Sequence, residues 1–146
     1  MGEKRRSYSF IEVLFVVIVI AVLAAIAVPR LGLGFAVKMK VKTAAQRLVS
    51  DLRLTRRLAI TNNQDYKLSV DSSAKEYSIY DSSETQTGVT RTLDSTLTIS
   101  ADKDFIFESL GNASSTSDTS ISLSADGNQA DITVTVATGM AGVSGP

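Results

Sequence analysis

The residue of greatest chemical interest is Glu12, a single carboxylate at the start of an apolar run. Every residue from Val13 to Val28 is apolar. A charged side chain costs about 3 kcal/mol at the centre of a bilayer and much less near its surface. A carboxylate at this position therefore needs a physical explanation.

The composition excludes several kinds of chemistry. The chain has 146 residues with no Cys and no His, which removes Cys/His metal sites, thiol nucleophiles, imidazole bases and disulfides. Carboxylates such as Glu76 and Asp81 could act as acid and base, but no pattern positions them. We expect no enzyme and no cofactor.

Oxygen-rich groups occur twice and could in principle ligate Ca²⁺. One is Asp102 with Asp104, and the other is Asp126 with Asn128 and Asp131. An Asp-Gly pair such as Asp126-Gly127 is typical of a turn. The sequence therefore predicts no metal site.

Charge is unevenly distributed, although 15 basic and 15 acidic residues balance overall. Residues 30–57 carry eight basic side chains and one acid, Asp51. Residues 62–146 carry four basic and twelve acidic side chains. A basic segment is thus joined to an acidic one, and solvated faces explain both most simply.

The apolar run has the length of a membrane span. Counted back to Tyr8 it contains about 21 residues, roughly 30 Å of helix. Pro29 follows, with Gly32 and Gly34 close behind. Proline removes a helical hydrogen bond and glycine loosens the backbone, so a kink is expected near residues 29–35.

A second helical segment follows over residues 30–62. Its mostly apolar positions recur at spacings of three and four, which predicts one narrow buried stripe on an amphipathic helix. The stripe consists of Val41, Ala45, Leu48, Leu52, Thr55 and Ala59. Asn62-Asn63 is the predicted stop.

Beyond residue 63 the apolar period changes to two, which is typical of strands with one buried face. About six strands are expected, antiparallel because the links are short. Their apolar pairs or triplets are Tyr66/Leu68/Val70, Tyr77/Ile79, Leu97/Ile99, Phe105/Phe107, Ile121/Leu123 and Ile132/Val134/Val136. The Ser/Thr-rich tracts 81–96 and 112–120 are predicted loops. The fold class is α+β, a long helix on a small antiparallel sheet.

Two ordinary explanations of the first 30 residues were considered. The apolar run has a suitable length for a secretory signal peptide cut near Ala27. The apolar region of such a peptide normally contains no acid, however, and Glu12 lies in it. A plain membrane anchor before a β domain tolerates Glu12 near the interface, but gives no reason for it.

The residues "RRSYSFIEVL" resemble the prepilin signal of type IV pilins and type II secretion pseudopilins. Its features are a short basic leader, a small residue before the cut, an aromatic after it, and Glu as the fifth mature residue. The cut would fall between Ser7 and Tyr8, which makes Pro29 the twenty-second mature residue. Family members also tend to carry a proline there. Ser7 departs from the usual Gly, which bears on cleavage efficiency.

The resemblance implies a bitopic protein of the bacterial inner membrane, with a cytoplasmic N-terminus and a periplasmic or extracellular head. Prepilin peptidase would remove leader 1–7 and methylate Tyr8. Helix 8–29 would span lipid and later pack in a filament core; segment 30–62 would continue it and 63–146 would form the head. Glu12 would pair with the Tyr8 ammonium of a neighbouring subunit, which sets the axial register because an unpaired buried charge is costly. The orientation rests on this resemblance, since basic residues flank the span on both sides.

The later sequence is similar to H-type pseudopilins and FimT-like minor pilins. The similarity lies in "RLVSDLRLTRRLAITNNQDYKLSV" and in the closing strands with a Thr-Gly near the end. It implies a structural subunit of a pilus or a secretion pseudopilus, with other subunits and an inner-membrane assembly platform as partners. DNA capture, as in FimT-like proteins, is the alternative function. The absence of basic residues after Lys103 argues against nucleic acid as a partner.

Overall fold

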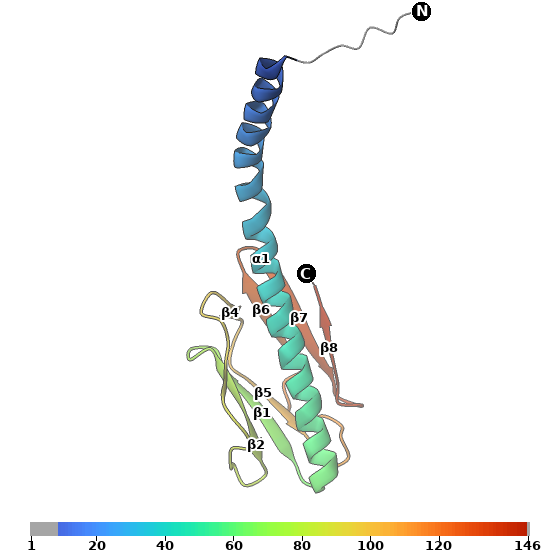
Figure 1. Cartoon of the computed structure of the whole chain (residues 1–146). Helices are drawn as coiled ribbons and strands as arrows, with labels where there is room; N and C mark the ends of the chain where they lie inside the picture. The colour runs from blue at the N-terminus through green and yellow to red at the C-terminus, as the bar shows by residue number, and fades with distance from the viewer. Residues whose placement is uncertain (1–8, 146) are drawn as a thin grey trace, which may run out of the picture. The chain divides into compact units, whose positions relative to one another are not determined.

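The structure is a computed structural model that describes residues 9–145, with the side chains of residues 26–33 outside that description. Within these residues one helix, α1 (Phe10–Asn62), is followed by eight strands (Figure 1). The chain forms two units, Met1–Ala36 and Val37–Pro146.

The first unit contains the N-terminal part of α1. The carbonyl oxygen of Ser9 accepts hydrogen bonds from the backbone N–H groups of Glu12 (2.9 Å) and Val13 (3.3 Å). In the described part of the chain, no helix carries a stretch long and apolar enough to cross a membrane. The leader 1–7 lies outside the described residues. The kink at Pro29 and the span 8–29 stay predictions.

The second unit begins with the amphipathic part of α1, and the predicted stripe is confirmed. All six stripe residues, from Val41 to Ala59, are fully buried. The helix ends at Asn62, as predicted. Asn63 takes a left-handed conformation (φ 49°), and the N–H of Gln64 donates to the carbonyl of Ala59 at 3.2 Å. This is the hydrogen bond of a Schellman cap, which asparagine permits because it tolerates positive φ.

The strands form two antiparallel sheets where the sequence suggested one. The first has the order β3-β2-β1-β5. Its strands are β1 (Tyr66–Asp71), β2 (Glu76–Asp81), β3 (Arg91–Thr92) and β5 (Lys103–Phe107). β1 lies in the middle and pairs with β2 through Leu68↔Ile79 and with β5 through Leu68↔Phe105.

The second sheet has the order β4-β6-β7-β8. Its strands are β4 (Thr98–Ile99), β6 (Ser120–Ala125), β7 (Asn128–Thr135) and β8 (Met140–Ser144). Asp126 and Gly127, both with positive φ, form the two-residue loop that joins β6 to β7. Asp-Gly suits such a hairpin because both positions need positive φ.

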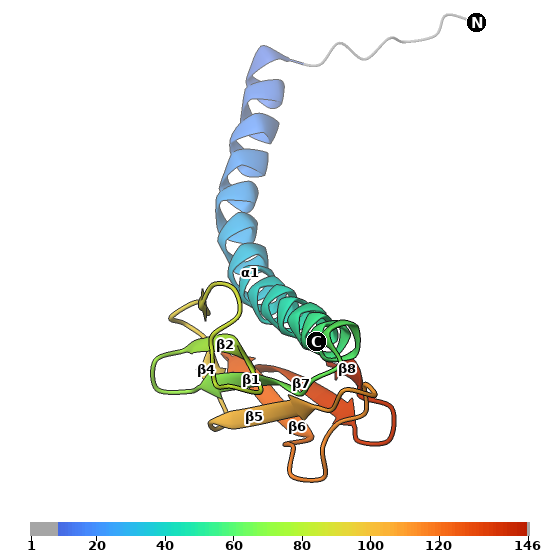
Figure 2. The ribbon, with the colours of Figure 1, turned by 90° about the horizontal axis from the view of Figure 1, so that it is seen from below.

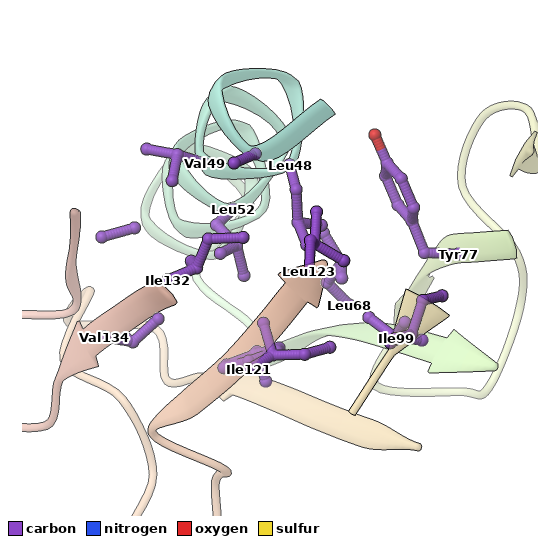
Figure 3. Packing of buried hydrophobic residues seen from close by; sticks show 14 of the residues in the cluster. Leu48, Val49, Leu52, Leu68, Tyr77, Ile99, Ile121, Leu123, Ile132 and Val134 are labelled. Carbon is purple, nitrogen blue, oxygen red and sulfur yellow. The ribbon is translucent and has the colours of Figure 1, made fainter. Parts of the chain in front are cut away.

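One hydrophobic core joins the helix to both sheets. Figure 3 shows Leu48 and Leu52 of α1 pointing toward strand residues such as Leu123 and Ile132. Leu68 of the first sheet belongs to the same cluster. Seen from below in Figure 2, the second half of α1 lies over the strands of both sheets. The helix and the two sheets therefore share a single core.

Three expectations about the strands were wrong in detail. The predicted loop 81–96 contains the short strand β3, and β8 was not predicted as a separate strand. β8 escapes detection because only Ala141 among its residues is buried. Val136 lies beyond the end of β7 and is 40% exposed, since the chain turns there toward β8.

Candidate functional site

The first described residues of α1 carry an apolar surface. Between residues 10 and 23, large apolar side chains are 40% to 84% exposed. They are Phe10, Ile11, Val13, Leu14, Phe15, Val16, Val17, Ile18, Val19, Ile20, Val22 and Leu23. We call this set the apolar helix surface.

The apolar helix surface covers all sides of the helix. Residues at every helical angle belong to it, so no polar face remains between Val13 and Leu23. A helix that is hydrophobic all round is buried in lipid or among other helices. This surface is therefore suited to bind a hydrophobic environment, and it is the candidate functional site.

Glu12 is exposed and lies in the first turn of α1. A negative charge near a helix N-terminus is favourable because the first N–H groups carry partial positive charge. Ser9 precedes the helix and Glu12 is its third residue, which is the Ser-x-x-Glu pattern of a capping box. The hydrogen bond described there joins the N–H of Glu12 to the backbone carbonyl of Ser9. The Ser-x-x-Glu pattern was visible in the sequence and was not used in the prediction.

The other predicted site residues lie outside what the structure describes. Ser7 and Tyr8 precede the first described residue, and Pro29 is described only as a helical position of α1. The predicted pairing of Glu12 with Tyr8 joins two different subunits. It stays a prediction.

A buried polar network fastens α1 to the first sheet. The phenolic O–H of Tyr77 on β2 donates to Oδ2 of Asp51 at 2.6 Å. The Nε of Arg91 on β3 lies 3.1 Å from the same oxygen. Both Asp51 and Tyr77 are buried, 8% and 2% exposed. Burial of the hydroxyl, together with its bond to the Asp51 carboxylate, raises the pKa of Tyr77, so it stays a proton donor.

Polar contacts also hold α1 to the loops and to β8. Lys40 pairs with Asp94 at 3.2 Å. Arg53 Nη2 donates to the carbonyl of Ala141 at 3.1 Å, and Arg56 Nε donates to the carbonyl of Gly111 at 2.7 Å. These two arginines bring α1 to strand β8 and to the loop after β5.

Two glycines allow the close packing beside Arg56. A Cβ added to Gly139 would lie 2.1 Å from the carbonyl oxygen of Gly111, and Gly139 has φ +61°. A Cβ on Gly111 would meet Ile60 Cδ1 at 2.6 Å. The Thr-Gly near the end of the chain thus has a structural reason: only glycine lets the two loops touch.

Two of the candidate calcium ligands, Asp102 and Asp131, accept hydrogen bonds from protein groups. Asp102 Oδ1 accepts hydrogen bonds from Ser72, and these lower the pKa of Asp102. Asp131 Oδ1 accepts from Ser122 and Gln129, which lowers its pKa as well. Among the described residues, no group of three or more acidic, His or Cys side chains could hold a metal ion.

Sequence reasoning missed the residues that attach the helix to the head. One signal was available, because Asp51 is the sole acid in the basic segment 30–57. A lone acid beside the stripe position Leu52 indicates a partner inside the protein. The partners themselves, Tyr77 and Arg91, depend on the tertiary fold.

Comparisons with known proteins agree with this arrangement. The model of a family described as type II transport protein GspH matches residues 44–144. Two solved structures of the minor pseudopilin EpsH from the type II secretion system of Vibrio cholerae are similar in fold. One has a TM-score of 0.55 at 15% identity and covers 73% of this chain and 96% of that chain. The other has a TM-score of 0.59 at 17% identity and covers 75% of this chain and 96% of that chain. No curated protein matches the sequence.

Proposed function

Since the chain belongs to the family of the type II transport protein GspH, we propose that it is a structural subunit, a minor pseudopilin of a type II secretion system. It is inserted in the inner membrane through helix 8–29 and then assembled through that helix into a short filament. Its partners are other pseudopilin subunits.

The apolar helix surface carries this proposal. Its side chains, from Phe10 to Leu23, are exposed within the chain itself, and exposed apolar area of this extent needs lipid or other helices around it. A filament core made of such helices provides that burial. The second half of the same helix, Val41 to Ala59, forms the core of the head, so each head is joined to its own assembly helix.

Processing creates the partner for Glu12 in this proposal. Prepilin peptidase cuts between Ser7 and Tyr8 and methylates the new N-terminus. The ammonium of Tyr8 then pairs with Glu12 of a neighbouring subunit during assembly. An acid amid apolar helices favours one axial register, because the charge is neutralised only where an ammonium lies opposite.

The same architecture would serve a type IV pilus, and the match of residues 44–144 to a type II transport family favours secretion. Deletion of the gene in its own host separates the two. Loss of protein secretion with normal surface pili supports the pseudopilin function, and the converse result supports a pilus.

The direct test is the intact mass and N-terminal sequence of the full chain recovered from cells with a prepilin peptidase. A start at Tyr8 with one added methyl group is the expected result. A start near Val28 would mean a secreted β domain, and an intact Met1 would mean a plain anchor. A Ser7→Gly variant measured in parallel shows whether Ser7 slows the cut.

A further inference from the structure

A basic cleft lies between the end of α1 and strand β8. It has a volume of about 320 Å³ and is lined by three arginines on one face of the helix. Its lining residues are Arg53, Arg56, Arg57, Ile60, Gly139, Met140 and Ala141. We call it the basic cleft.

Hydrogen bonds hold two of the arginines of the basic cleft in place, and neither is neutralised by them. Arg53 donates to the carbonyl of Ala141 and Arg56 to that of Gly111, and neutral carbonyls leave the positive charges uncompensated. Within the described residues, none of Arg53, Arg56 and Arg57 forms an ion pair. Fixed guanidinium groups bind carboxylates with little loss of entropy.

A second hollow, of about 310 Å³, lies beside the end of β1 and the start of β5 and has the opposite charge. Four carboxylates and one ammonium line it, a net charge of three negative. These residues are Asp71, Asp102, Asp104, Asp118 and Lys103, together with Ser69 and Val70. We call it the acidic hollow.

Hydrogen bonds favour the charged form of two carboxylates in the acidic hollow, Asp71 and Asp102. Hydrogen bonds from Ser73 and from Ala74 lower the pKa of Asp71, and Ser72 does the same for Asp102. Among the described residues that line the hollow, only Asp118 forms an ion pair, with Lys103 Nζ at 2.9 Å. Within the described residues, Asp71, Asp102 and Asp104 form no ion pair.

The two surfaces share no residue. The helix that carries the basic cleft ends beside the start of β1, and the acidic hollow lies at the other end of β1. Its first residue, Tyr66, touches the end of the helix, where Asn62 Nδ2 donates to the tyrosine oxygen at 2.7 Å. Its last residue, Asp71, lines the acidic hollow, and a strand of this length spans roughly 17 Å. β1 is the middle of a paired sheet, so one chain cannot bring its two charged surfaces together.

We propose that the basic cleft of one copy of this chain binds the acidic hollow of a second copy, in a head-to-tail contact between head domains. The three guanidinium groups of the cleft match the three net negative charges of the hollow. Because the two surfaces differ, the contact is heterologous and leaves a free cleft and a free hollow at its ends. It goes beyond assembly through the apolar helix, since it concerns residues 37–146.

The cleft suits carboxylates of a folded head better than the backbone of nucleic acid. Ile60 and Met140 at its edge are 46% and 64% exposed, and apolar edges favour a protein surface. Duplex binding grows with the number of phosphate contacts, and this cleft offers three cations. The acid-rich remainder of the head repels a duplex.

Cysteine cross-linking of the full chain in membranes tests the contact, and the absence of native cysteine makes it clean. One chain carries Met140→Cys at the cleft and a differently tagged chain carries Ala101→Cys beside Asp102. Both positions are exposed. Oxidation should form a disulfide that joins the two differently tagged chains. The matched control replaces either cysteine by Val89→Cys, at an exposed position outside both surfaces. These pairs of chains should form no cross-link.

Exchanging the charges of the two surfaces tests whether electrostatic attraction between them holds the contact. Arg57→Glu on the Met140→Cys chain should lower the cross-linked yield roughly ten-fold, because like charges then face each other. Asp104→Lys on the Ala101→Cys chain should restore it. Lys42→Glu, the same charge change outside the cleft, should have no effect. Neither Arg57 nor Asp104 has a side-chain bond within the described residues, so both variants should fold.

Three results would overturn the proposal. The first is that the two tagged chains form no cross-link. The second is that the cross-linked yield stays the same when the charges are exchanged. The third is that the full chain retards duplex DNA in a gel and that Arg57→Glu abolishes this retardation. The last would make the cleft a phosphate site. None depends on cleavage before Tyr8, so an uncut N-terminus with a charge-dependent cross-link would refute the proposed function and leave this contact standing.

Discussion

Tyr77 of β2 donates its hydroxyl proton to Asp51 of α1 across the boundary between helix and sheet, with 2.6 Å between the oxygens. Arg91 contacts the same carboxylate from β3. The three residues come from three separate elements, so their contact fixes the rotation of the helix on the sheet. The part of the helix that carries Asp51 belongs to the same compact unit as the head, Val37–Pro146.

Removal of the Tyr77 hydroxyl should weaken this attachment. We expect Tyr77→Phe to lower the free energy of unfolding of the head by about 1–3 kcal/mol, because a buried carboxylate loses a hydrogen bond. Thermal unfolding of the detergent-solubilised full chain, followed by circular dichroism, measures it. Tyr80→Phe is the matched control, since the Tyr80 hydroxyl has no hydrogen bond in the described structure. Equal stability of both variants would contradict the prediction.

A methyl group at Gly139 should be more damaging than one at an open glycine. Gly139→Ala brings its Cβ within 2.1 Å of the Gly111 carbonyl in a left-handed backbone conformation. We expect a loss of about 2 kcal/mol or more, with β8 and the contact of Arg56 disturbed. Gly142 lies three residues further on, in β8, and an added Cβ there would have nothing within 4 Å. Gly142→Ala should therefore change stability little. The same unfolding measurement compares them, and a neutral Gly139→Ala would refute the close approach.

Stability should fall in acid because the carboxylates of the head have lowered pKa values. Thr96 hydrogen bonds, with the Lys40 ammonium, lower the pKa of Asp94 from 3.8 to about 2. Asp71 and Asp131 shift in the same direction. A group with a depressed folded pKa stabilises above its unfolded pKa, and this stability is lost as pH falls through the folded value. The window therefore runs from about pH 4 to about pH 2.

Unfolding temperatures measured between neutral pH and the acid window check this directly. They should stay level at neutral pH and drop below about pH 4. Asp94→Asn should make the drop shallower, because the variant has one proton-binding site fewer. A midpoint that rises on acidification would contradict the assignment of these shifts.

The sequence predicted the helix well because periodicity and capping are local. The stripe from Val41 to Ala59 is buried as its spacing indicated, and the helix stops at Asn62 because Asn63 can take positive φ. The Asp126-Gly127 hairpin was predicted for the same reason. In each case the residues that decide the structure are neighbours in the chain.

The division into two sheets and the polar attachments of the helix could not be predicted in this way. β3 has two exposed residues in a polar tract, and β8 has one buried residue. Neither strand therefore shows the alternation of apolar and polar residues that predicts a strand. Arg53 and Arg56 bind backbone carbonyls of residues 88 and 55 positions away. A carbonyl carries no sequence signature, and only the tertiary fold places it near an arginine.

Glu12 has two physical explanations, and two substitutions separate them. It is the third residue of α1 after Ser9, so it fits a capping box, where Gln serves as well as Glu. It also fits an ion pair with the Tyr8 ammonium of a neighbour, which requires the charge. Glu12→Val removes both functions, whereas Glu12→Gln removes only the charge.

If the ion pair directs assembly, both variants should insert in the membrane but enter filaments poorly. Loss of one member of a buried pair costs about 3–5 kcal/mol, which corresponds to a fall in incorporation on the order of 100-fold or more. The measurement is the amount of variant in sheared or affinity-purified filament, divided by the amount in the membrane. Normal incorporation of Glu12→Gln with loss for Glu12→Val would assign the residue to helix capping, and normal incorporation of both would end the charge-pair account.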